Sequence, residues 1–418
     1  MSDRFSPLAG LRVIDLSKVL AGPVCTQYLG DLGADVIKIE PCDGGDDTRS
    51  WPPFGGVDGA VFLSCNKNKR SMALDLKTEA GLGILKRLVA SSDVFVESFR
   101  TGVTQRLGVD YTSLTEIKPD LIYASISGFG RSGPLAAAPG YDVMVQAFSG
   151  LMSITGEKGR APARSAFSPL DQTTGVHTAL GILAALRRRD QTGQGQLLET
   201  SLYETALSFL SYTAQVYWTS GRVPERSGSG HESLCPYQAF PASDDYILIA
   251  VGNDKLWRSL CSVLGFDALA NDPRYATNAA RVARFDETVK LVADEIAKHP
   301  VAEWARRLTA AGIPNSPIHN TAEALSHPQA AARGMLAPLP HPAAGIVNSI
   351  AMPVLFDGYS REPRSAPPLL GEHSVEILSE LGIAGAEARD LIDRGIVRAG
   401  PGPAPRQQTT GEVQHHEA

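Results

Sequence analysis

Short apolar runs alternate with longer segments of helical spacing along the first 130 residues. Strands are predicted for the runs at 12–16, 36–40, 71–76, 94–97 and 121–125. Helices are predicted for the segments at 24–32, 79–90 and about 114–118. Pro23 suits the first turn of the earliest helix, and Gly33 marks its end. These repeated strand–helix–strand units predict an α/β fold with a large, doubly wound, Rossmann-like domain.

The pattern changes after residue 220. A helix predicted at 202–219 leads into the polar, glycine-rich stretch 221–230, which is typical of a domain boundary or a mobile loop. Beyond it, a smaller α+β domain is predicted from a strand at 246–251 and helices at 255–264, 281–298 and 301–311. A strand-like run at 354–356 and a helix at 374–381 follow. The predicted parts are therefore 1–220, 221–330 and 331–400, with a tail at 401–418 expected to be disordered.

Composition excludes several classes of protein. The chain has 418 residues, 43% of them hydrophobic, and its 39 basic and 45 acidic residues include no dense basic block. We therefore expect a small-molecule partner, with no nucleic acid and no membrane. No stretch has the length and apolarity of a signal core or a span, which predicts a cytoplasmic protein. Five scattered cysteines and nine dispersed histidines indicate no metal site.

Asp171 lies where the polar run 168–175 gives way to an apolar helical segment at 176–186. Aspartate is a favoured helix N-cap, because its side chain accepts hydrogen bonds from the first backbone N–H groups of the helix. On this pattern alone, capping is favoured over catalysis. A carboxylate held at this position is also a candidate nucleophile, and both interpretations stay open from the residues alone.

Residues Gly128 to Gly133 spell G-x-G-x-x-G directly after the predicted strand 121–125. This spacing is the fingerprint of dinucleotide-binding proteins, so an NAD-dependent oxidoreductase is a distant alternative function. The third glycine of that motif must open a helix, whereas here Pro134 and Pro139 bracket a short alanine-rich stretch. We therefore favour a surface loop.

Several motifs in order along the first 385 residues resemble the class III (CaiB/BaiF) coenzyme A transferases. They include the segments at 8–16, 21–23, 32–40, 66–71, 74–77, 171–175, 181–186, 192–196, 236–240 and 370–373. The resemblance implies that Asp171 carries the acyl group and that a coenzyme A thioester is a co-substrate, with no permanently bound cofactor. It also implies that residues 331–400 return to the large domain. Two chains are expected to form an interlocked homodimer.

The resemblance also implies where coenzyme A binds. The residues that match the coenzyme contacts of the family are Leu20, Ala21, Leu74, Lys77, Ser98, Phe99, Arg100 and Arg106. Tyr141 is expected beside them, near the cleft. The first two belong to the loop 17–23, which from the residues alone is either a ligand loop or a plain strand-to-helix turn. Lys77 and Arg106 are expected to pair with phosphates, and Phe99 to stack on adenine.

This chain departs from the family pattern at two positions. Pro41 and Pro139 stand where some relatives have a phosphate-binding Arg and Lys. The residues considered as replacements are Arg49, Lys69, Arg70 and Arg100.

A second group of residues is expected to serve the acceptor acid. Gln27 and Gln172 are expected near the cleft by resemblance and could bind the carboxylate of the acceptor. Gly228, Gly230 and His231 match the glycine-containing loop of the family and form either a lid or an ordinary linker. His231 or Arg226 is considered as a reader of a second carboxylate.

The expected reaction transfers coenzyme A between two acids through an anhydride and a thioester of Asp171. Our preferred substrates are succinyl-CoA as donor and a small dicarboxylic acid as acceptor. The related α-methylacyl-CoA racemases share the fold and are the main alternative. Those enzymes use a histidine where this chain has Tyr141, and an unperturbed phenol with a pKa near ~10 is a poor base, which favours the transferase.

Overall fold

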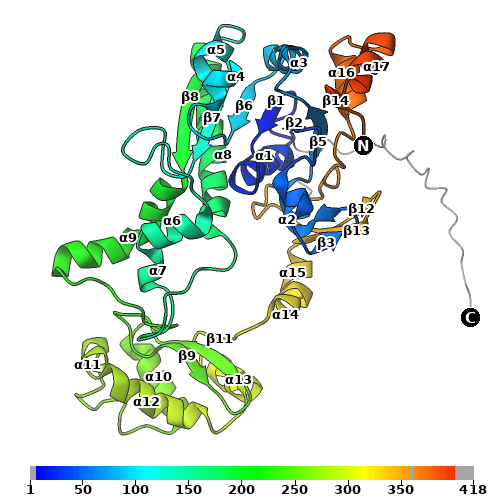
Figure 1. Ribbon diagram of the computed structural model, residues 1–418. Helices are drawn as coiled ribbons and strands as arrows, with labels where there is room; N and C mark the ends of the chain where they lie inside the picture. Colours follow the sequence, from blue (N-terminus) through cyan, green and yellow to red (C-terminus); the bar gives the residue numbers. More distant parts are fainter. Residues whose placement is uncertain (1–5, 358–360, 401–418) are drawn as a thin grey trace, which may run out of the picture. The chain divides into compact units, whose positions relative to one another are not determined.

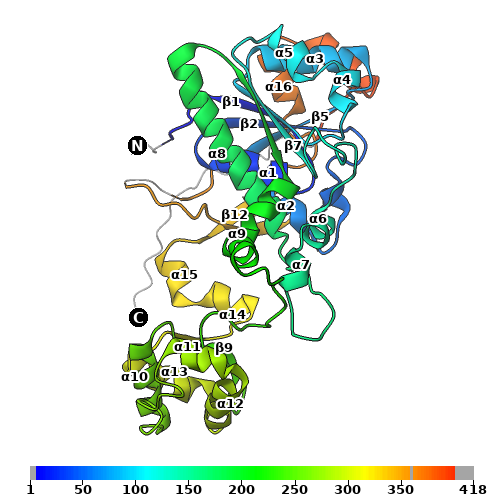
Figure 2. The ribbon, with the colours of Figure 1, turned by 90° about the vertical axis from the view of Figure 1, so that its left-hand side faces the viewer.

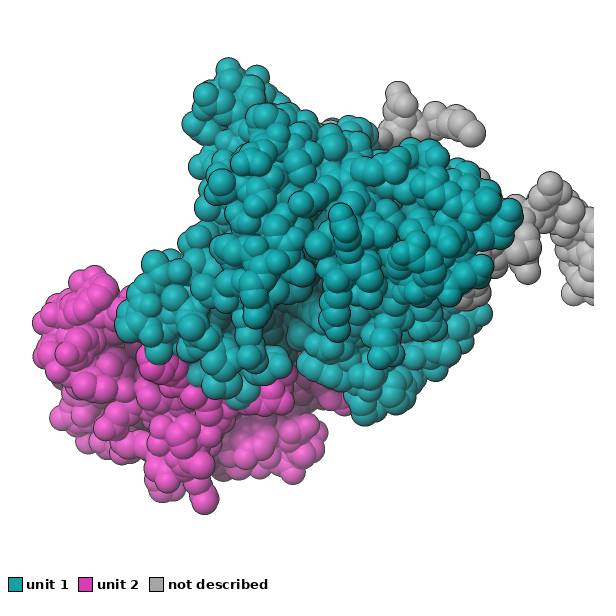
Figure 3. All heavy atoms as spheres, turned by 45° about the horizontal axis from the view of Figure 1, so that its top comes forward, with its two compact units in different colours: residues 1–145, 167–209, 331–418 teal, residues 146–166, 210–330 magenta. Residues whose placement is uncertain are grey.

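The computed structural model describes residues 6–357 and 361–400, so the predicted tail at 401–418 lies outside the described residues. The chain divides into two compact units, coloured separately in Figure 3. The smaller unit comprises 146–166 and 210–330, and the larger unit comprises the rest. The sequence placed the boundary at 221 and assigned 146–166 to the large domain. The chain instead leaves the larger unit next to Ser211, whose backbone (φ 32°, ψ −116°) interrupts a helix.

The larger unit is built on a seven-stranded sheet in the order β14-β5-β2-β1-β6-β7-β8 (Figure 1). Its strands are β1 (Arg12–Leu16), β2 (Asp35–Glu40), β5 (Lys69–Leu74), β6 (Val94–Glu97), β7 (Ile122–Ser127), β8 (Gln196–Ser201) and β14 (Val397–Arg398). All adjacent pairs are parallel except β14 and β5. The chain starts at β1 in the middle, winds outward to β5, and then returns to β6 on the other side. The predicted doubly wound sheet is confirmed.

Helices cover both faces of this sheet (Figure 2). One face packs on α3 (Glu79–Ala90), α5 (Tyr111–Thr115), α16 (Ser374–Glu380) and α17 (Gly385–Asp393), which share one buried apolar cluster with the strands. The other face carries α1 (Ala21–Asp31) and α8 (Pro169–Thr192). A Cβ on Gly175 of α8 would lie 2.6 Å from the Ala21 carbonyl oxygen, so the glycine permits close packing of these two helices.

Shorter elements complete the larger unit. They are the 3-10 turn η1 (Asp47–Ser50), β3 (Phe54–Gly55), β4 (Asp58–Gly59), α2 (Ala60–Cys65), α4 (Val103–Leu107), the hairpin β12 (Leu336–His341) and β13 (Gly345–Ile350), and the start of α6 (Asp142–Phe148). The strand predicted at 354–356 is wrong, because the run has no strand partner and its Val354 and Leu355 are exposed. The strands of this region form the hairpin just before it instead.

The smaller unit is an α+β structure with a three-stranded antiparallel sheet in the order β11-β10-β9. Its strands are β9 (Tyr237–Pro241), β10 (Tyr246–Ala250) and β11 (Asn315–Pro317). Its helices are α7 (Leu151–Ile154), the later part of α9 (Leu202–Ser220), α10 (Asp254–Leu264), α11 (Asn278–Ala283), α12 (Phe285–Ile296), α13 (Val301–Ala310), α14 (Thr321–Ser326) and most of α15 (Pro328–Ala332). The single helix predicted at 281–298 is two helices, because Arg284 leaves helical geometry (φ −120°, ψ 43°).

Among residues 6–357 and 361–400, no helix combines the length and the apolar character that a membrane span requires.

Candidate active site

A cavity of about 430 Å³ lies at the carboxyl ends of the central strands of the larger unit. Its wall includes the loops that follow β1, β6 and β7, together with Tyr141 and Asp171. The strand order reverses between β1 and β6, and open α/β sheets bind ligands at such a switch point. All the residues that line the cavity belong to the larger unit. This hollow is the candidate active site.

The loop after β1 is held in a strained conformation. Val19 has φ 69°, a left-handed value that costs free energy for a β-branched residue and persists only when its surroundings enforce it. The Val19 N–H points at the Asp46 carboxylate, and Lys38 pairs with that carboxylate at 3.0 Å while donating to the Ser17 carbonyl at 2.9 Å. A Cβ on Gly22 would lie 2.1 Å from the Ser17 Cβ, so the turn into α1 requires glycine. The buried ions thus shape this wall of the cavity.

Asp171 lies in the first turn of α8, and it does not cap that helix. The N-cap residue is Ser168, whose side chain makes no capping hydrogen bond. The buried Asp142 carboxylate instead accepts hydrogen bonds from the backbone N–H groups of Leu170 (2.8 Å) and Asp171 (3.1 Å). Of the two interpretations left open by the sequence, capping by Asp171 does not hold, because a carboxylate distant in sequence already serves the helix terminus. The Asp171 side chain is left to line the cavity.

The environment of Asp171 disfavours its charged form. Burial and then the negative charge of Asp142 raise the pKa of the Asp171 carboxyl to about 7. A strongly shifted carboxyl group in a cavity is a candidate for chemistry, because structural roles rarely benefit from such a shift. Two basic side chains also reach the wall, namely Lys18 and Arg100, whereas the third, Arg131, is paired with Glu97. The site therefore combines a carboxylate of raised pKa with cations suited to an anionic ligand.

The raised pKa predicts a dependence of stability on pH. A proton bound in the folded state up to about pH 7 stabilises the protein at low pH, and this contribution is lost as the pH rises from the unfolded pKa through the folded one. At pH 8 the Asp171→Asn variant should therefore be more stable than the wild type by roughly 2 kcal/mol, a value reduced for partial solvent exposure. At pH 4 the two proteins should unfold at the same urea concentration. Asp190→Asn, an exposed position on the same helix, should show no such pH dependence.

Comparison with known proteins identifies the class. The profile of CoA-transferase family III matches residues 8–374. The chain belongs to CoA-transferase family III. It is 40% identical to the succinate–glutarate CoA-transferase of Agrobacterium fabrum, over 91% of this chain and 97% of the relative. It is also 40% identical to the acetyl-CoA:oxalate CoA-transferase of Acetobacter aceti, over 90% and 95%. A crystal structure of a CaiB/BaiF family protein from Brucella suis superposes with a TM-score of 0.81 at 39% identity, over 90% and 99% of the chains.

Seven of the expected site residues lie together in this family III transferase. Leu20, Ala21, Ser98, Phe99, Arg100 and Tyr141 line the same cavity as Asp171. Leu74, Lys77 and Arg106 do not line it. The Leu74 side chain is buried in the core of the sheet, so it cannot contact a ligand in solvent. Lys77 and Arg106 are exposed, on the turn after β5 and on α4, and their phosphate contacts stay predictions.

Three of the four cations considered as replacement phosphate ligands are already engaged. Arg49 is buried and binds the carboxylates of Glu40 and Asp58 at 2.7 and 2.8 Å. Lys69 is buried and pairs with Asp15. Arg70 binds three carboxylates of the larger unit, those of Asp35, Glu376 and Glu380. Of these four candidates, only Arg100 lines the cavity of the transferase.

Gln27 and Gln172 line a different cavity, of about 290 Å³. Successive residues of a helix point about 100° apart, so Gln172 and Asp171 point in different directions from α8. The Gln27 amide oxygen accepts a hydrogen bond from the Lys67 N–H at 3.1 Å. The expectation that these glutamines bind the acceptor acid stays a prediction, since in the larger unit they line this second cavity and not the one with Asp171.

The loop with Gly228, Gly230 and His231 belongs to the smaller unit. The His231 ring stacks on Tyr212 with centroids 6.1 Å apart, and its Nδ1 accepts the Ser233 N–H at 3.0 Å. The Arg226 guanidinium donates to the carbonyl oxygens of Ser153 and Arg160. These contacts order the loop within its own unit. Its role as a lid of the transferase stays a prediction.

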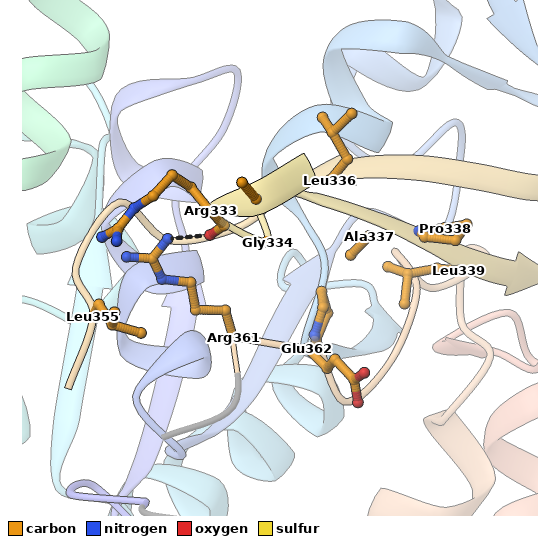
Figure 4. Close-up of a pocket in the computed structure, with 11 residues that line it drawn as sticks. Arg333, Gly334, Leu336, Ala337, Pro338, Leu339, Leu355, Arg361 and Glu362 are labelled. Atoms are coloured by element: carbon orange, nitrogen blue, oxygen red, sulfur yellow. Dashed lines mark hydrogen bonds between the residues drawn. The ribbon is translucent and has the colours of Figure 1, made fainter. Parts of the chain in front are cut away.

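A larger cavity, of about 610 Å³, contains none of the expected site residues (Figure 4). It is lined by parts of 332–339, by Leu355 and by 361–363, and the Arg361 guanidinium there donates to the Arg333 carbonyl at 2.8 Å. Its single lining carboxylate is Glu362, so it lacks the combination found around Asp171. Among the described residues, no cluster of His, Cys, Asp and Glu is suited to a metal ion.

Two residues of the site were not predicted from the sequence. Asp142 caps α8 from 28 residues upstream of Leu170, and nothing local in the sequence pairs them. Arg131 lies within the G-x-G-x-x-G motif and lines the cavity. As expected, no helix follows Gly133, and the stretch up to residue 140 is a loop.

Proposed function

We propose that this transferase moves coenzyme A from succinyl-CoA to a small dicarboxylic acid, with the Asp171 carboxylate as the covalent carrier. The observation that carries the proposal is the position of that carboxylate. It lines the cavity at the switch point of the sheet, and its capping role is taken by Asp142. The succinate–glutarate enzyme among the relatives supports the preferred substrates. The oxalate enzyme is equally similar, so oxalate should also be tried as an acceptor.

In the proposed first half-reaction, an Asp171 carboxylate oxygen attacks the carbonyl carbon of succinyl-CoA. The C–S bond breaks, giving an aspartyl–succinyl anhydride and the CoA thiolate. The thiolate then attacks the Asp171 carbonyl carbon, and the C–O bond breaks to release succinate. The product is an aspartyl-CoA thioester. No water is consumed, so the free energy of the thioester is conserved.

The second half-reaction repeats these steps in reverse order. The acceptor carboxylate attacks the aspartyl thioester and forms a new anhydride with release of the thiolate. The thiolate attacks the acceptor carbonyl carbon, which forms the new acyl-CoA and restores the Asp171 carboxylate. A raised pKa suits this cycle, because the poorly solvated carboxylate is a stronger nucleophile and forms readily near neutral pH.

The surrounding groups have separate roles in this proposal. Arg100 and Lys18 line the cavity and are placed to pair with phosphates of the coenzyme. Phe99 also lines it and offers an aromatic face for the adenine ring. The first N–H groups of α8 are occupied by Asp142, so the oxyanions require donors elsewhere in the cavity. The interlocked homodimer and the cytoplasmic location implied by the sequence stay predictions.

Intact-protein mass spectrometry after mixing with succinyl-CoA tests the proposal. The wild type should gain the mass of a succinyl or CoA adduct that hydroxylamine removes, and Asp171→Ala should gain none. An adduct of equal mass on the alanine variant would assign the carrier to another residue. If the wild type shows no adduct with several donors but exchanges an α proton of a 2-methylacyl-CoA into deuterated solvent, the protein is a racemase and the proposal fails.

A further inference from the structure

The G-x-G-x-x-G loop has no nucleotide-binding helix, yet four of its residues line the cavity beside Asp171. Its side-chain anchor is Arg131, which uses each of its three guanidinium nitrogens. Nε donates to the Ser125 Oγ at 2.8 Å, and Nη1 donates to the Phe99 carbonyl at 2.6 Å. Nη2 donates to the Glu97 carboxylate at 2.9 Å and to the Ile126 carbonyl at 3.1 Å.

These bonds connect the segments that follow two neighbouring strands. Glu97 ends β6 and is almost fully buried, and its carboxylate also accepts the Phe99 N–H at 2.7 Å. Both backbone groups of Phe99 are thereby held, one by Glu97 and one by Arg131. A second link joins the same segments, since the Thr101 Oγ1 donates to the Ala136 carbonyl at 2.6 Å.

We propose that Arg131 is a positioning residue of the coenzyme site, which joins the loops after β6 and β7 into one preformed wall. The inference rests on the proposed function, because it requires acyl-CoA to occupy this cavity. Arg131 acts through Phe99 and the glycine loop, since each of its three guanidinium nitrogens already donates to a protein group. Loops that are ordered before binding lose less conformational entropy when the ligand arrives. Loss of Arg131 should therefore weaken acyl-CoA binding while the chemistry at Asp171 continues.

The test compares wild type, Arg131→Gln, Arg131→Lys and the exposed control Arg258→Gln. The concentration of succinyl-CoA that gives half-maximal Asp171 adduct should rise about tenfold or more in Arg131→Gln, as expected for a loss near 1.4 kcal/mol. The adduct yield and rate at saturation should stay within about threefold of wild type. Arg131→Lys keeps the positive charge but loses the planar guanidinium group with its several donors. Its half-saturating concentration should lie between those of wild type and Arg131→Gln. Arg258→Gln should match wild type. Unchanged half-saturation in Arg131→Gln overturns the inference.

A second pair of measurements separates positioning from stability and from the proposed function. Arg131→Gln leaves the Glu97 carboxylate buried without its cation, so the variant should be less stable. The double variant Glu97→Gln, Arg131→Gln removes that unpaired charge and should recover stability while the half-saturating concentration stays high. If the double variant regained both wild-type stability and the wild-type half-saturating concentration, Arg131 would serve only to neutralise Glu97. Calorimetry measures the affinity of wild type and Arg131→Gln for free CoA even if wild type forms no adduct. Failure of the covalent mechanism is thereby distinguished from failure of this inference.

Discussion

Replacement of Asp171 by alanine should lower transferase turnover by about four orders of magnitude or more. The carboxylate is the proposed carrier of both covalent intermediates, and a methyl group can form neither. Asp142 is a neighbouring carboxylate, but its Oδ2 accepts hydrogen bonds from two backbone N–H groups at 2.8 and 3.1 Å. An oxygen held in that way is a poor substitute for the lost nucleophile. The rate of product acyl-CoA formation, followed by chromatography with saturating donor and acceptor, measures the effect.

The loss should not come from unfolding. Because Asp142 caps α8, removing the Asp171 side chain breaks no capping bond, and the variant should be at least as stable as wild type above pH 7. Asp190→Ala removes an exposed carboxylate from the same helix and should keep full turnover. Turnover by Asp171→Ala above about a tenth of wild type would remove this residue from the mechanism.

The succession of strands and helices along the first 130 residues was predictable because each strand is a short apolar run followed by a helix of clear periodicity. The segments 12–16, 79–90 and 94–97 coincide with β1, α3 and β6 to the residue. The strands β1 and β6 are buried on both faces and read as short apolar runs, whereas α3 buries one side at helical spacing. The edge strand β8, the short β14 strand and the β12–β13 hairpin were missed. Half-buried edge residues, two-residue pairing and an exposed hairpin leave little pattern in the sequence.

The site was only partly predictable, since its decisive contacts join residues far apart in the chain. Aspartate before an apolar helix is a sound capping signal, and only the approach of Asp142 shows that the cap is supplied elsewhere. Likewise, Arg49 and Lys69 resemble phosphate ligands in the sequence, while the fold buries both against carboxylates. Charge at a position is visible in a sequence, but its partner is decided by the tertiary structure. The residues expected by resemblance are spread from Leu20 to Tyr141 along the chain, yet six of them line one cavity with Asp171, which no local pattern indicated.

Removal of the Asp15 carboxylate should produce the largest loss of stability. Asp15 is fully buried in β1 and accepts hydrogen bonds from Thr26 and from the Ser17 N–H, with the Lys69 ammonium 3.1 Å away. Asp15→Ala leaves that ammonium buried with only neutral acceptors, those of Pro23 and Asn66. Breaking a buried pair in this way costs about 3–5 kcal/mol. Urea unfolding followed by circular dichroism measures the free energy of unfolding.

The same pair predicts a pH dependence of defined sign. Burial by itself raises the pKa of Asp15, but the ammonium groups of Lys69 and Lys38 more than offset it and the pKa is lowered. The contribution to stability is therefore present above the unfolded pKa near ~4 and is lost as the pH falls below it. Asp15→Ala should lack this acid-dependent loss and approach wild-type stability at low pH. Equal stabilities at pH 7 would contradict the prediction.

Two further variants decide how the buried pair acts. Asp294→Ala breaks an exposed pair with Lys290 and should cost less than about 0.5 kcal/mol. The double variant Asp15→Leu, Lys69→Met replaces both buried charges with apolar groups and should recover much of the lost stability. It should not recover binding of CoA. The Ser17 N–H would still lack its acceptor, and the loop that carries Leu20 and Ala21 into the cavity is held at that point. Recovered stability without recovered binding would show that apolar groups can replace these buried charges in the fold but not in shaping the active site.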